Sequence, residues 1–168
     1  MLRSVGTGAE VGFSWFGLVL GAVIFGPNLL YVALPARNAP VPPASAALVL
    51  TVLERAGQAA TVTLLVVSGG RLAAAPWWVL PAGVCVVAYW GLWARYLWRG
   101  REFAALYASW GPLPIPMAVL PVVAFGIAAV AAGWTPLLAA VGMLTVGHVA
   151  SSRAARAALP PGASAPPR

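Results

Sequence analysis

The chain has 168 residues, of which 61% are hydrophobic and 8% are charged, and its mean hydropathy is +0.89. Soluble domains carry roughly 25% charged residues, and a soluble fold of this length would leave too much apolar surface exposed; the composition therefore predicts an integral membrane protein. The net charge of +7 comes from ten arginines against three glutamates, and because these arginines lie between apolar runs and not on one basic face, a nucleic-acid partner is not expected.

Five apolar segments approach the length of about 20 residues that a helix needs to cross a bilayer. We expect an all-α, polytopic helical bundle in one transmembrane domain (residues 1–157), with spans at 11–34, 45–67, 76–98, 116–132 and 136–157. Within it, Gly26-Pro27 predicts a kink, Ser45 an N-cap, and the residues from Arg99 to Trp110 a short interfacial helix. A Pro/Ala-rich tail, 158–168, is expected to be disordered.

The arginines predict the orientation in the membrane. With five spans, two arginines fall on the N-terminal side, Arg3 and Arg71, and eight fall on or near the other side. Because arginine-rich loops stay in the cytoplasm, we expect a multi-pass protein of the cell membrane with its N-terminus outside and its C-terminus in the cytoplasm. A cleaved signal peptide is the alternative for the first segment, although its apolar stretch exceeds the usual length of roughly 7–15 residues.

Strongly polar side chains within the spans fall only in the half nearer the arginine-rich side. Glu54 and Gln58 share one face of the second span with Thr51 and Thr61, and His148 reaches the same depth on the fifth. Ionisable groups inside a span usually face a cavity or a partner. The sequence therefore predicts a polar pocket open to the cytoplasm. Its expected ligand-binding residues are Glu54, Arg55, Gln58, Arg95, His148, Tyr96, Arg101 and Asn28.

A structural role is the alternative for these residues. Arg95 can anchor the chain at the lipid headgroups, Glu54 can simply pair with an arginine, and His148 can be a hydrogen-bonded structural histidine. One cysteine and one histidine exclude a Cys/His zinc site, and no Walker A, GxSxG or HExxH motif is present. We therefore expect no metal or cofactor, and the set of candidate acid–base groups is thin for an enzyme.

Three functions remain open. The first is a non-enzymatic protein that binds or conducts a small, anionic solute or lipid headgroup, which arginines suit. Because five helices make a thin pathway, transport would require a homo-oligomer. The second is an accessory subunit of a larger membrane complex, because the chain is small and its helices are rich in Gly and Ala. The third is a lipid-modifying enzyme that uses Glu54 or His148 for acid–base chemistry.

Overall fold

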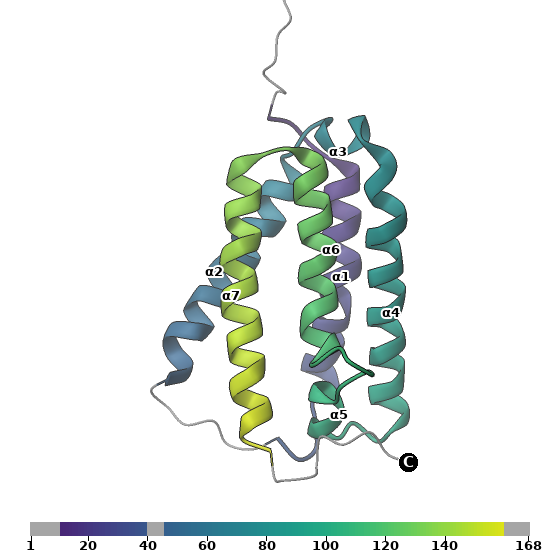
Figure 1. The fold of residues 1–168 in the computed structure, drawn as a ribbon, viewed down its shortest axis with the longest axis vertical. Coiled ribbons are helices and arrows are strands. Elements are labelled where there is room, and N and C mark those ends of the chain that lie inside the picture. The colour runs from purple at the N-terminus through teal and green to yellow at the C-terminus, as the bar shows by residue number, and fades with distance from the viewer. Residues whose placement is uncertain (1–10, 40–45, 160–168) are drawn as a thin grey trace, which may run out of the picture.

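The computed structural model describes residues 11–39 and 46–159. Within them the chain is helical, as predicted, and its long helices run up and down side by side (Figure 1). The elements in chain order are α1 (Trp15–Ala33), α2 (Ala46–Val66), α3 (Arg71–Ala74), η1 (Pro76–Trp78), α4 (Val79–Trp98), α5 (Phe103–Tyr107), α6 (Pro116–Ala132) and α7 (Thr135–Ala157). The expected N-cap Ser45 and residues 160–168 of the expected tail lie outside the described residues.

In the described part of the chain, four helical stretches are long and apolar enough to cross a membrane: α1, α2, η1 with α4, and α7. This confirms the prediction of a membrane protein. The remaining long helix, α6, is apolar but has only 17 residues. It lies among the other helices (Figure 1) and buries ten of its residues, including Phe125 and Ala128, so α6 forms the centre of the bundle.

Two glycines bring the backbones of α2 and α7 into contact. A Cβ atom added to Gly57 would lie 2.6 Å from the backbone of Leu144, and one added to Gly147 would lie 2.6 Å from the backbone nitrogen of Glu54. Small residues permit this kind of close helix crossing in membranes. The crossing therefore fixes Glu54 of α2 against α7.

Pro27 lies inside α1, at the expected kink, yet the helix continues to Ala33. A proline has no N–H, so the carbonyl of Val23 four residues earlier loses its helical partner. The indole nitrogen of Trp90 on α4 donates to this carbonyl at 3.0 Å. A second aromatic donor, the Tyr96 hydroxyl, reaches the Leu34 carbonyl at 3.1 Å. These bonds attach α1 to α4.

The start of α1 is attached to the end of α2. Gly12 and Ser14 donate their backbone N–H groups to the carbonyls of Val67 and Val66 at 3.1 and 2.7 Å, and Gly69 donates back to Gly12 at 2.7 Å. The two helices then separate along their length, and α2 slants away from α1 towards the other end of the bundle (Figure 1). The closest contacts between α1 and α2 are therefore near this end, where a Cβ atom on Gly17 would overlap the Leu65 carbonyl.

The bundle has one arginine-rich end, where the last residues of α1, α4 and α7 meet the first residues of α2 and α6 (Figure 1). This end carries Arg37, Arg95, Arg99, Arg101, Arg153 and Arg156. At the opposite end, Arg71 lies over the ring of Trp134 at 5.1 Å, and the indole nitrogen of Trp78 donates to the Leu72 carbonyl at 2.9 Å. The two ends thus differ sharply in charge.

Candidate functional site

A cavity of about 490 Å³ lies in the half of the bundle nearer the arginine-rich end. We call it the polar cavity. Helices α1, α2, α4, α5, α6 and α7 all contribute to its wall. Glu54 lies eight residues from the start of α2 and His148 nine residues from the end of α7. At about 1.5 Å per residue, both polar groups are about 12–14 Å inside the helix ends.

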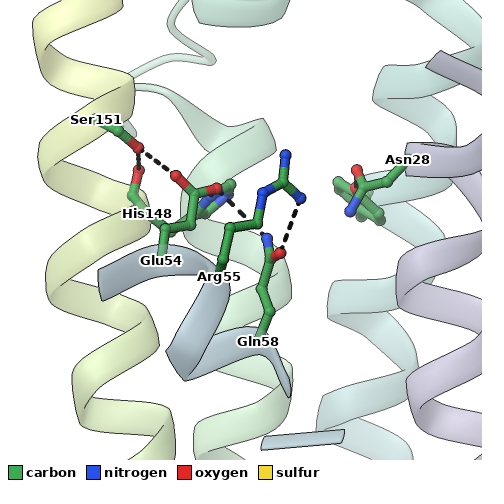
Figure 2. A network of polar contacts seen from close by, with 7 residues as sticks. Asn28, Glu54, Arg55, Gln58, His148 and Ser151 are labelled. Carbon is green, nitrogen blue, oxygen red and sulfur yellow. Dashed lines mark hydrogen bonds and ion pairs between the residues drawn. The ribbon is translucent and has the colours of Figure 1, made fainter. Parts of the chain in front are cut away.

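The carboxylate of Glu54 is the centre of a hydrogen-bonded network between α2 and α7 (Figure 2). Its Oε1 lies 2.7 Å from His148 Nδ1, and its Oε2 accepts from the Ser151 hydroxyl at 2.7 Å. Gln58 Nε2 also donates to Oε1, at 3.4 Å. Two bare acceptors would repel at 2.7 Å, so a proton lies between Glu54 and His148.

The hydrogen-bonded partner of Glu54 on α7 is therefore His148. Among the described residues no arginine nitrogen lies within 4.0 Å of this carboxylate, so the alternative in which an arginine pairs with Glu54 does not hold. The neighbouring Arg55 turns its guanidinium towards Asn28 instead (Figure 2), and its Nη1 donates to Gln58 Oε1 at 3.1 Å.

The opposite wall of the polar cavity comes from α1 and α4. The Tyr89 hydroxyl donates to Asn28 Oδ1 at 3.3 Å, and Trp93 packs edge-on against Tyr89 with ring centroids 6.3 Å apart. Asn28 is exposed, whereas both aromatic rings are buried. This wall therefore presents an amide to the cavity in front of an aromatic layer.

The inner end of the polar cavity carries both polar and apolar side chains, among them Gln58 and His148. The cavity narrows to a small pocket beside Ile24, Leu144 and the stacked rings of Phe25 and Phe125, whose centroids are 5.8 Å apart. Beyond this point the described core is filled by buried aliphatic side chains such as Leu65. The polar cavity thus ends inside the bundle.

The short helix α5 covers the polar cavity from the arginine-rich end. Leu106 and Tyr107 of α5 enter its wall together with Ile115, which precedes α6. Burial, together with the nearby Tyr31 and Glu54, raises the pKa of the Tyr107 hydroxyl to about 12. This hydroxyl therefore stays protonated and can serve as a hydrogen-bond donor.

Of the eight expected ligand-binding residues, five line the polar cavity: Asn28, Glu54, Arg55, Gln58 and His148. The other three do not line it. Arg95 has a buried Nε and Nη2 without a hydrogen-bond partner. Tyr96 is fully buried, and its hydroxyl bonds to α1. Arg101 has a left-handed backbone (φ 63°), and its carbonyl accepts from Arg37 N at 3.1 Å.

The site also contains residues that were not among the eight expected ones, notably Ser151, Tyr89, Trp93 and Tyr107. Ser151 lies one helical turn after His148, so both side chains are on the same face of α7; this spacing in the sequence could have identified Ser151 as part of the site. Its hydroxyl bonds to Glu54 and to the His148 carbonyl, at 2.7 and 3.2 Å, and not to the imidazole. A serine nucleophile activated by a histidine is therefore not assembled here.

Within residues 11–39 and 46–159, no group of three or more His, Cys, Asp or Glu side chains could hold a metal ion. Comparisons with protein-family models, with curated proteins and with solved structures found no match. The chemistry of the polar cavity therefore has to be argued from its own residues.

Proposed function

We propose that this chain is a five-span protein of the cell membrane, with its N-terminus outside and its arginine-rich end in the cytoplasm, whose polar cavity binds a small anionic group. The concentration of arginines at one end supports the orientation. The position of α6 at the centre of the bundle supports the fifth span, because 17 apolar residues reach the lower limit of about 17 for crossing a bilayer.

The observation that carries the proposal is the state of Arg55. Its guanidinium lies in the cavity wall, bonds to Gln58, and has no carboxylate within 4.0 Å among the described residues, because Glu54 is paired with His148. A guanidinium carries five N–H donors and favours carboxylate or phosphate. Arg55 is exposed within the cavity wall, so its guanidinium is accessible to such an anion.

The closed inner end favours binding over conduction. A conducting path would have to pass the stacked rings of Phe25 and Phe125 and the buried aliphatic core beyond them. The hydrogen-bonding side chains of the cavity wall, among them Asn28, Gln58 and His148, lie in the half nearer the arginine-rich end. A ligand that enters the polar cavity therefore leaves on the side from which it entered.

The proposal is tested by native mass spectrometry of the full chain extracted in mild detergent. We expect an anionic molecule to remain bound to the wild type. We expect Arg55→Gln to weaken its retention about 10- to 100-fold, which corresponds to one lost charge-assisted hydrogen bond of about 1.5–3 kcal/mol. The matched control is Arg153→Gln, an exposed arginine in the last turns of α7 that does not line the cavity. Equal retention by both variants contradicts the proposal.

The contact between Glu54 and His148 favours a second candidate function, proton transfer to or from the bound ligand. A carboxylate at Nδ1 orients the imidazole and leaves its Nε2 to act as acid or base. If this function exists, His148→Ala abolishes chemical change in the retained molecule while the molecule still binds. A retained molecule that is never altered by the wild type would rule it out.

A further inference from the structure

The polar cavity is open sideways, between α1 and α2. Near the opposite end of the bundle, α1 and α2 touch, because a Cβ atom on Gly17 would overlap the Leu65 carbonyl. One turn further along, a Cβ atom on Gly21 would meet the side chain of Val62 at 3.9 Å, an ordinary contact. Nearer the arginine-rich end the two helices have diverged, and the polar cavity fills the space between them.

The sideways opening has apolar edges. Leu29 and Val32 of α1 belong to the cavity wall, and yet they are 74% and 79% exposed. On α2, Val52 is 58% exposed near Arg55. Exposed aliphatic side chains at a helix surface within the bilayer face acyl chains. By contrast, α5 covers the cavity from the arginine-rich end with Leu106 and Tyr107.

The polar groups inside the opening lie deeper than the headgroups of the surrounding bilayer, so a lipid headgroup has to leave the interface to reach them. Arg55 follows the first residue of α2 by nine positions, which places it about 13–14 Å from the helix end. A ligand that meets Arg55 through the sideways opening must therefore tolerate both hydrocarbon and a guanidinium. This combination is the property of an amphiphile, whose chain remains between Leu29, Val32 and the bilayer.

From this geometry we infer that the polar cavity takes an anionic amphiphile, which enters sideways between α1 and α2. Its phosphate or carboxylate binds to Arg55 with Asn28 and Gln58 beside it, and its acyl chain lies along the exposed face of α1. The inference rests on the proposed function and adds the class of ligand and its route.

In the first experiment, the full chain in detergent is incubated with equal amounts of phosphatidylglycerol and phosphatidylcholine, and the retained lipid is measured by native mass spectrometry. In the second experiment, inorganic phosphate and glycerol phosphate are titrated into the protein by calorimetry. We expect retention of phosphatidylglycerol over phosphatidylcholine. We expect Val32→Trp, which narrows the opening, to lower this retention at least about tenfold. The control is Val87→Trp, on α4, where the valine is similarly exposed (73%) and lies outside the cavity wall.

Each outcome decides the inference. Selective retention that falls in Val32→Trp and Arg55→Gln, but not in Val87→Trp, supports it. Binding of phosphate or glycerol phosphate that depends on Arg55, without retained lipid, overturns the amphiphile and leaves the proposed function standing. Lipid retained equally by all variants is surface lipid and overturns the inference. Binding of neither lipid nor soluble anion overturns the inference and the proposed function together.

Discussion

Gly147 is the position where one methyl group should disrupt the site. In Gly147→Ala the new Cβ atom would lie 2.6 Å from Glu54 N and 2.8 Å from Glu54 Cα. Both are backbone atoms of α2 and cannot rotate away. Restoring an ordinary contact of 3.4 Å requires α2 and α7 to separate by about 0.8 Å at this point.

The same displacement acts on the pair between Glu54 and His148. Their distance of 2.7 Å would lengthen to about 3.5 Å, which is beyond the ordinary range of a strong hydrogen bond. Overpacking costs about 1–3 kcal/mol, and a lost charge-assisted hydrogen bond costs about 1.5–3 kcal/mol. We expect a net destabilisation of about 3 kcal/mol, or a fall in Tm of roughly 6–12 °C for a chain of this size.

The assay is thermal unfolding of the purified protein in detergent, followed by circular dichroism. Gly142→Ala is the matched control, because it lies on the same helix and a Cβ atom there meets nothing within 4 Å. Both variants gain the same helix propensity of about 1 kcal/mol, so their difference isolates the clash. If Gly147→Ala unfolds at the same temperature as Gly142→Ala, the close crossing of α2 and α7 is refuted.

Three further predictions follow from the site and the topology. Ser151→Ala removes the 2.7 Å bond to Glu54 and should lower the free energy of unfolding, measured by chemical denaturation, by about 1–2 kcal/mol. An unchanged denaturation midpoint would contradict a stabilising role for this bond. Burial raises the Tyr107 pKa from 10 to about 12, so the neutral hydroxyl contributes stability below pH 10 that is lost as the pH rises to 12. The tyrosinate absorbance of Tyr107, measured as the wild type minus Tyr107→Phe, should therefore appear near pH 12. If it appears near pH 10, the burial of this hydroxyl is contradicted. Reporter tags on the two termini should give opposite compartments, and the same compartment would mean an even number of spans.

The sequence predicted the helices well because prolines and glycines delimit the apolar segments. The expected segment 116–132 coincides with α6, which begins at Pro116 and is capped by Gly133 in a left-handed conformation. The short helix α3 was not predicted, and η1 was expected only as the first turn of the third span, 76–98. Three or four residues are too few to show a helical period in the sequence.

The depth of a polar residue could be predicted, but its direction could not. Counting from the helix ends places Glu54 and His148 at one level, and the structure brings them together. The side of α4 that faces the cavity was not foreseeable, because α4 has polar or aromatic residues on several faces. The residues of α4 in the cavity wall are Tyr89 and Trp93. Tyr96 lies about one turn nearer the arginine-rich end, and its hydroxyl bonds to the Leu34 carbonyl at the end of α1.

The bonds from the ring nitrogen of Trp90 and from the Tyr96 hydroxyl join α1 to α4, while the glycine crossing joins α2 to α7. A further helix, α6, packs against both α4 and α7 and therefore joins the two pairs along their length. The distance between α1 and α2 at the arginine-rich end thus depends on how α6 is packed, and not on the Gly12 bonds alone.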